Sequence, residues 1–129
     1  MKKKIRREFI LVALFTITLT TLLVTAVFYE FFKKEVMDEL DIDIQVLQET
    51  GVFETADIEN GLREMPLDDL RISLIAQDGS VLYDNDANVG NLGNHGDRPE
   101  VSQALQSGKG QSVRRSDTMD ESAFYYAVR

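Results

Sequence analysis

The hydrophobic and polar positions divide the chain into an apolar N-terminal stretch and a mixed remainder. Residues 9–29 form an uncharged run of 21 residues, which as an α-helix would be about 31 Å long and would match the hydrocarbon core of a bilayer. Five basic side chains lie before this run, and aromatic residues and two lysines lie at its far end, as at a membrane interface. The pattern predicts a transmembrane helix over residues 9–32.

The charges around this helix predict its orientation. Loops rich in lysine and arginine stay on the cytoplasmic side of a membrane. Residues 1–8 are therefore predicted to be cytoplasmic and residues 33–129 extracytoplasmic, in a cell-membrane protein whose chain, as given, crosses the bilayer once. A cleaved signal peptide is the alternative, but its apolar region usually spans about 7–15 residues and ends at a small-residue cleavage site. This run is longer and ends in bulky aromatic residues, which favours an uncleaved anchor.

The helix is predicted to continue beyond the membrane. Apolar residues recur four, four and three residues apart, at Val36, Leu40, Ile44 and Leu47. This spacing is typical of a helix, and neither proline nor glycine separates it from the span. We expect one continuous helix over residues 30–50 that ends at Gly51, a residue type common just after helix ends. Its apolar stripe can pack on its own domain or on the same helix of a second copy.

Alternating apolar residues and turn residues predict an α+β domain after this helix. The predicted elements are a short helix over 57–64, a β-hairpin over 71–84, a turn-rich loop over 85–96, a helix over 98–107, an edge strand over 111–115, a turn over 116–121 and a strand over 122–129. Asp78–Gly79 marks the hairpin turn, and Pro99 and Gly108 mark the two ends of the second helix. Together they predict an antiparallel sheet covered on one face by helices.

Composition and charge restrict what this domain can do. Residues 30–129 have nine basic and 21 acidic side chains, a net charge of about −12 at neutral pH. Nucleic-acid binding requires a cationic surface, so this class is excluded. The chain has no cysteine and one histidine, so neither a disulfide nor a structural zinc site is expected. No set of nucleophile, base and acid is recognisable, and no catalytic residue is predicted.

The order of the motifs resembles the extracytoplasmic sensor region of bacterial two-component sensor histidine kinases, and most closely that of the phosphate-regulon sensor kinases. The motifs are RISLIAQDGSVLYDND at 71–86, NHGDRPEVSQAL at 94–105 and SGKGQSVRRSDTMDESAFYYAVR at 107–129. The resemblance implies a PAS-like (single Cache) domain over residues 33–129. In such domains the last strand usually lies between the first and the penultimate strand. The resemblance therefore implies that the chain is truncated before that strand, with a gap in its sheet that would make it poorly stable alone.

The resemblance also implies a function. The chain would be the sensory front of a histidine kinase that continues through a second membrane helix, a HAMP linker, a dimerisation helix and an ATP-binding domain. ATP and magnesium are implied only for that kinase part, which would phosphorylate a response regulator; no cofactor is expected in this chain. A homodimer is expected, in which the sensor domain shifts residues 30–50 and the membrane helix. A chemoreceptor, a cyclic-dinucleotide enzyme and a stand-alone anchored binding protein are the alternatives.

Four basic side chains are the candidate ligand-binding residues implied by the resemblance: His95, Arg98, Arg114 and Arg115. In related Cache-type sensors, such side chains hold small anions between the sheet and the covering loop and helix. The guanidinium group binds carboxylate or phosphate through two hydrogen bonds, and a helix N-terminus adds a favourable dipole.

Other interpretations of these residues remain open at this stage. The arginines can form ordinary ion pairs with nearby acidic residues, and a histidine in a polar loop is commonly exposed. A partner protein can replace the small ligand. Calcium is not expected at Asp84, Asp86 and Asp97, because their spacing does not form a ligand loop and aspartate is common in turns.

Overall fold

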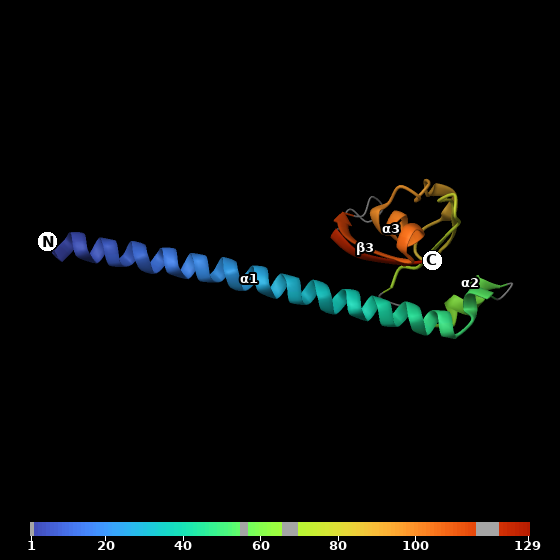
Figure 1. The fold of residues 1–129 in the computed structure, drawn as a ribbon, viewed down its shortest axis with the longest axis horizontal. Coiled ribbons are helices and arrows are strands. Elements are labelled where there is room, and N and C mark those ends of the chain that lie inside the picture. Colours follow the sequence, from blue (N-terminus) through green and yellow to red (C-terminus); the bar gives the residue numbers. More distant parts are fainter. Residues whose placement is uncertain (1, 55–56, 66–69, 116–121) are drawn as a thin grey trace. The chain divides into compact units, whose positions relative to one another are not determined.

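The computed structural model describes residues 2–54, 57–65, 70–115 and 122–129. The described part of the chain is an α+β protein, in which a long N-terminal helix is followed by short helices and small antiparallel sheets (Figure 1). It divides into two compact units, Met1–Val36 and Met37–Arg129. The first unit is helical throughout its described residues, and the strands belong to the second.

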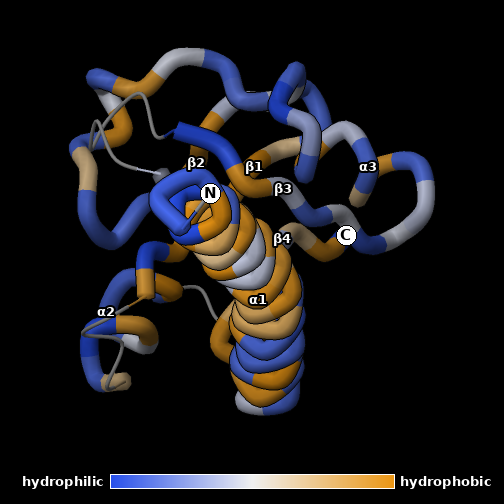
Figure 2. The backbone as a smooth tube through the Cα atoms, turned by 90° about the vertical axis from the view of Figure 1, so that its left-hand side faces the viewer, coloured by the Kyte–Doolittle hydropathy of each residue, from blue (hydrophilic) through white to orange (hydrophobic). Residues whose placement is uncertain are grey.

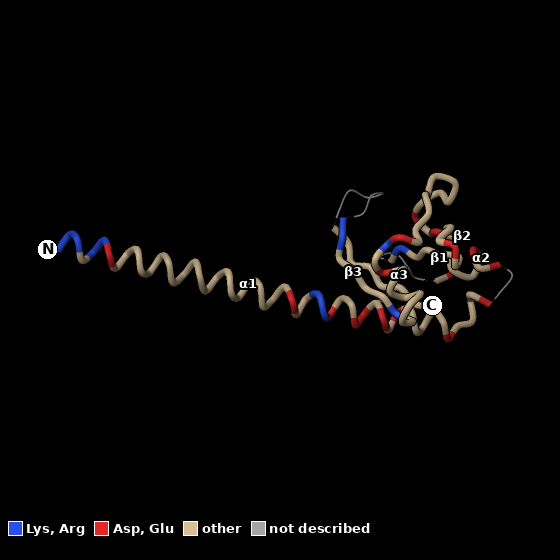
Figure 3. The backbone as a smooth tube through the Cα atoms, turned by 45° about the horizontal axis from the view of Figure 1, so that its top comes forward, with Lys and Arg blue, Asp and Glu red and all other residues tan. Residues whose placement is uncertain are grey.

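Helix α1, Lys2–Glu49, confirms the continuous helix predicted through the apolar run and beyond it. Its apolar stretch is exposed along its whole length, and Figure 2 shows hydrophobic residues concentrated there. Basic residues lie before this stretch and acidic residues are frequent after it (Figure 3). By length and composition α1 can span a membrane, and a signal sequence near an N-terminus has the same properties.

The C-terminal part of α1 belongs to the second unit and supplies part of its core. Leu47 is buried and packs with Val52 and Leu62. Val52 lies in the turn η1, Val52–Glu54, and Leu62 lies in α2, Ile58–Arg63, which confirms the predicted short helix. Gly51 has a φ of 68°, the left-handed conformation predicted after the end of the helix.

The predicted hairpin is confirmed by β1, Ser73–Ile75, which pairs antiparallel with β2, Val81–Asp84. Its turn is closed by hydrogen bonds from Gly79 N to Ala76 O and from Ala76 N to Ser80 O. Gly79 has a φ of 85°, and a Cβ atom there would lie 2.5 Å from the backbone nitrogen of Gly96. Only glycine both adopts this φ readily and leaves room for the backbone of Gly96. The hairpin turn therefore packs directly against the end of the loop that follows the hairpin.

The second predicted helix is α3, Pro99–Ser107, and its buried side chains are Glu100, Val101 and Ala104. Gly108, with a φ of 92°, ends it. Strand β3, Lys109–Arg115, begins two residues earlier than predicted and pairs antiparallel with β4, Ser122–Val128. The turn predicted over 116–121 lies outside the described residues.

The single sheet predicted from the sequence is corrected by the structure. Within the described ranges, β1 pairs only with β2 and β3 only with β4, so the strands form two separate two-stranded sheets. Alternation of apolar and polar residues identifies a strand, and a nearby turn identifies its hairpin partner. The strand that pairs with the other edge of a hairpin comes from a distant part of the chain, and no local sequence pattern specifies which strand it is.

Candidate ligand-binding site

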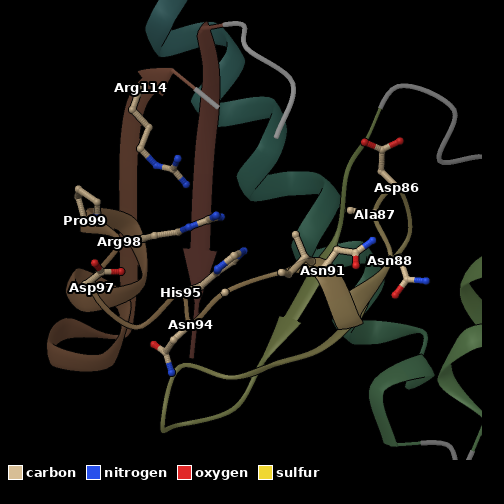
Figure 4. A pocket seen from close by; sticks show the side chains of 12 residues that line it. Asp86, Ala87, Asn88, Asn91, Asn94, His95, Asp97, Arg98, Pro99 and Arg114 are labelled. Carbon is tan, nitrogen blue, oxygen red and sulfur yellow. The ribbon is translucent and has the colours of Figure 1, made fainter. Parts of the chain in front are cut away.

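A concavity of about 780 Å³ lies between the loop after β2, the first turn of α3 and strand β3 in the second unit. Figure 4 shows that His95, Arg98 and Arg114 project to the same side, toward the loop that holds Asn88 and Asn91. Three of the four candidate residues therefore lie together, although they come from a loop, a helix start and a strand.

His95 is held in place by its loop rather than exposed. Its backbone nitrogen donates to Gly79 O at 2.7 Å, and the side chain of Asn94 donates to Asp78 O at 2.7 Å. The side chain of His95 is 3% exposed, which excludes the interpretation of an exposed loop histidine. Its Nε2 atom is buried and has no hydrogen-bond partner among the described residues. A buried polar atom in this condition is uncommon, because it costs free energy until water or a ligand satisfies it.

Arg114 is neutralised by Glu100, which lies in the first turn of α3. The Arg114 guanidinium donates to Glu100 Oε1 at 2.7 Å and to Oε2 at 3.3 Å, and Ser112 Oγ donates to Oε2 at 2.5 Å. Burial raises the pKa of Glu100, but these hydrogen bonds outweigh burial and hold the pKa below its usual value. The guanidinium also stacks on Tyr125, with its central carbon 3.9 Å from the ring centre.

Arg98 lies at the N-cap of α3 and is half-buried, and its side chain makes no capping hydrogen bond. Within the described part of the chain, no carboxylate lies in ion-pair distance of it, and the nearby Glu100 forms its ion pair with Arg114. Burial, and then the charge of Arg114, lower the pKa of Arg98 from its usual value. Arginine nevertheless keeps its charge in proteins. Arg98 thus brings a positive charge to the pocket that no described acidic group neutralises at close range.

Arg115 is placed differently from the other three candidates. It is exposed at the end of β3 and is not among the residues that line the pocket. Side chains of neighbouring strand residues point to opposite faces, so a strand that directs Arg114 toward the pocket directs Arg115 away from it.

A second buried ion pair was not predicted from the sequence. Arg71 Nε donates one bifurcated hydrogen bond to both carboxylate oxygens of Asp84, each at 3.1 Å, and Arg71 Nη2 donates to Oδ2 at 3.0 Å. The Asp84 carboxylate also accepts one from Ser73 Oγ at 2.6 Å. The hairpin register pairs Ser73 with Asp84, and Arg71 lies two residues before Ser73 on the same face. The register of β1 and β2 therefore places Arg71 beside Asp84, but this register is not known from the sequence alone.

Among the residues that the structure describes, no group of three or more histidine, cysteine, aspartate or glutamate side chains could hold a metal ion.

A cluster of polar side chains links α1 to the sheet of β3 and β4. Lys109 Nζ donates to Asp41 Oδ1 at 2.6 Å, and Tyr126 OH donates to the same oxygen at 2.5 Å. Gln45 donates to the other oxygen at 2.9 Å. We call Asp41, Lys109 and Tyr126 the helix–sheet cluster. Hydrogen bonds from Lys109 and then Tyr126 lower the pKa of Asp41 below its usual value.

Comparisons of the chain with protein-family models, with curated proteins and with solved structures gave no match. The site is therefore interpreted from its own geometry and charges.

The burial of His95 predicts a pH dependence of stability. Burial, then the positive charges of Arg98, Arg71 and Arg114, lower the pKa of His95, against the opposing effect of a hydrogen bond that its ring donates to the backbone of Asn94. The unfolded chain then binds a proton more readily than the folded chain. The stability that depends on a neutral His95 should therefore be fully present above a pH of about 6.5 and should decrease as the pH falls below that value.

This dependence can be assigned cleanly, because His95 is the only histidine in the chain. We expect the melting temperature of the native chain to decrease between pH 7.5 and 5.5, and the slope to be smaller in His95→Phe. Circular dichroism melts of both proteins in lipid nanodiscs measure this. Equal slopes in the two proteins would contradict the buried neutral histidine.

Proposed function

We propose that this chain is the membrane-anchored sensory region of a bacterial two-component sensor histidine kinase, and that its second unit is an extracytoplasmic receptor for a small anion. The observation that supports a receptor is the pocket in which the half-buried Arg98 lacks a described counter-charge and the buried His95 Nε2 lacks a described partner. A half-buried guanidinium without a close counter-charge costs free energy that a bound anion recovers, which is a common property of a binding site for a charged ligand.

The order of elements supports the kinase-sensor part of the proposal together with the sequence resemblance. A long N-terminal helix leads into a hairpin, a short helix and a second hairpin. The two hairpins are unjoined, which is compatible with a PAS-like sheet in which a further strand lies between β1 and β4. In such a protein the kinase part, its ATP and its response regulator belong to the cytoplasmic portion.

The helix–sheet cluster supports a route for the signal. β3 contributes Arg114 to the pocket and Lys109 to the cluster, and Lys109 holds Asp41 of α1. A ligand that displaces β3 would therefore act on the same helix that continues into the apolar stretch. We propose that the signal is a small displacement of α1 between the two subunits of a homodimer.

Binding by the full chain in lipid nanodiscs tests the receptor proposal. Phosphate or a small carboxylate at 100 times its dissociation constant should stabilise the folded domain by about 2.7 kcal/mol and raise its melting temperature. Arg98→Gln should abolish the rise, and Arg115→Gln, a change of the same type outside the pocket, should preserve it. If no anion raises the melting temperature of the native chain, the receptor proposal is wrong.

The orientation of the anchor has its own test, because a chain without cysteine allows single cysteines to be labelled specifically. In intact bacterial cells a membrane-impermeant maleimide should label Gln106→Cys and should not label Lys3→Cys. Labelling of the latter, or recovery of shortened protein from the medium, would contradict an uncleaved anchor with a cytoplasmic N-terminus.

The helix–sheet cluster gives a spectroscopic prediction. Asp41 should titrate below the usual aspartate range, and Lys109→Gln should move its pKa upward, because the first cause of its lowered pKa is removed. Carboxyl carbon NMR of the labelled chain measures this, with Lys34→Gln as the control on the same helix. An Asp41 titration that is the same in both variants would show that the cluster does not form.

A further inference from the structure

The first turns of α1 concentrate positive charge. Residues 2–8 contain five basic side chains and one acidic side chain, all of them exposed, and the first turn of the helix has no acidic residue. Figure 3 shows the basic residues at the N-terminal end of α1, before the uncharged stretch. Positive charge there is opposed by the helix dipole and by repulsion between the side chains themselves. An anionic partner offsets both effects.

Four of these cations form two neighbouring pairs on the helix surface. Residues four positions apart lie on one face of a helix, with their Cβ atoms about 5–6 Å apart. The two pairs with this spacing are Lys2 with Arg6 and Lys3 with Arg7. The acidic residue of the segment, Glu8, has the same spacing from the fifth cation, Lys4. Within the described part of the chain, no ion pair neutralises the four paired cations.

The position of the pairs on the anchor corresponds to the phosphate layer of a membrane. The uncharged run begins at Phe9, and a helix rises about 1.5 Å per residue, so the paired cations lie within about 11 Å of the end of the hydrocarbon segment. The headgroup region on each side of a bilayer is about 5–8 Å thick, and the side chains of lysine and arginine are long enough to reach along it. Two cations that are neighbours on the helix can contact the oxygens of one phosphate group between them.

The other end of the uncharged stretch has the opposite charge. Residues 30–43 contain two basic and six acidic residues, and one of the acidic residues, Asp41, is paired with Lys109. An anionic headgroup that is attracted at the Lys2 end is therefore repelled at this end. Charge complementarity restricts the contact with anionic lipid to one leaflet.

We propose, on the basis of the proposed membrane anchor, that the two cation pairs bind the phosphate groups of anionic phospholipids in the leaflet at the Lys2 end of α1. One phosphate lies between the cations of each pair. Zwitterionic phospholipids bind more weakly at this end, because their own cationic group offsets the attraction of the phosphate.

A chain without tryptophan allows a direct test, because one introduced tryptophan is then the only such fluorophore. Phe9 and Phe28 lie near the two ends of the uncharged run and are 75% and 71% exposed, so Phe9→Trp and Phe28→Trp each place a tryptophan against lipid. Each full-length variant is reconstituted in vesicles of phosphatidylcholine and phosphatidylglycerol, in which one lipid or the other has brominated, quenching acyl chains. At Phe9→Trp we expect phosphatidylglycerol to be favoured about fivefold, the effect of about one basic side chain near an anionic surface. At Phe28→Trp it should not be favoured.

Neutral replacements in the Phe9→Trp chain identify the cations. Glutamine at all four paired positions should reduce the preference to near unity, whereas Lys33→Gln together with Lys34→Gln, at the other end of the span, should leave it unchanged. A preference that survives the four replacements would overturn the assignment to these pairs.

The same measurement separates the lipid inference from the anchor. Both leaflets of the vesicles have the same lipids, so the result does not depend on the orientation of the chain. Equal quenching by the two brominated lipids at Phe9→Trp would overturn the lipid inference and leave the anchor in place. If neither lipid quenches either tryptophan, α1 does not span the bilayer and the anchor proposal fails with it.

Discussion

Replacement of Asp84 by alanine is expected to destabilise the second unit by about 3–5 kcal/mol, the cost of removing one partner of a buried ion pair. The Asp84 side chain is fully buried, and it accepts hydrogen bonds from Arg71, Ser73 and the backbone nitrogens of Asp86 and Ala87. Its loss leaves the Arg71 charge without its partner and releases the start of the loop that forms one wall of the pocket. The melting temperature should fall by roughly 12 °C or more.

Asp86→Ala is the matched control for this change, since Asp86 is exposed and only two residues away. It should alter stability by no more than about 0.5 kcal/mol. Burial raises the pKa of Asp84, but the hydrogen bonds from Arg71 and Ser73 outweigh it and hold the pKa below its usual value. The stabilisation is therefore present above a pH of about 4 and is lost as the pH falls through the folded-state pKa. A difference between native and Asp84→Ala proteins that persists undiminished at pH 2 would contradict this account.

Gly110→Ala is expected to have the second large effect, a loss of about 3 kcal/mol. A Cβ atom at Gly110 would overlap the carbonyl oxygen of Glu100 and would lie 2.8 Å from Gln103 Cβ and 2.9 Å from the backbone nitrogen of Ala104. Two of these atoms belong to the backbone of α3, so no side-chain rotation relieves the overlap. The helix must move away from β3, and the Glu100–Arg114 pair that forms one side of the pocket is stretched.

Gly93→Ala tests whether this result is specific to the helix–strand contact. A Cβ atom at Gly93 would have nothing within 4 Å, and its backbone is not in the left-handed region. Its stability should match that of the native chain in thermal melts. We also expect Gly110→Ala to weaken anion binding in the same samples, because α3 holds Arg98 and β3 holds Arg114. Native stability in Gly110→Ala would show that α3 does not pack directly on β3.

Much of the secondary structure could be predicted from the sequence, because its determinants are local. The apolar run and the stripe from Val36 to Leu47 specified one continuous helix, and Gly51 specified its end. The turn at Asp78–Gly79 specified the first hairpin, and Pro99 and Gly108 specified α3. Each signal depends on residues within a few positions of one another.

The sequence and its resemblance indicated all three basic residues that the structure brings together at the site, His95, Arg98 and Arg114. They did not show that the fourth candidate, Arg115, lies outside it. Strand alternation predicts opposite directions for Arg114 and Arg115, but it does not say which of the two faces the loop.

The sequence by itself determined the long helix, the first hairpin, the two strands after α3 and the acidic charge of the second unit. Only the tertiary structure decided that His95 is buried, that Glu100 is occupied by Arg114, and that Asp41 meets Lys109. These properties depend on groups brought together from distant parts of the chain. The net charge at a site is the sum of its charged groups after neighbouring ion pairs have formed. The periodicity of residues along the chain does not show which of these ion pairs form, and so it does not predict the net charge of the site.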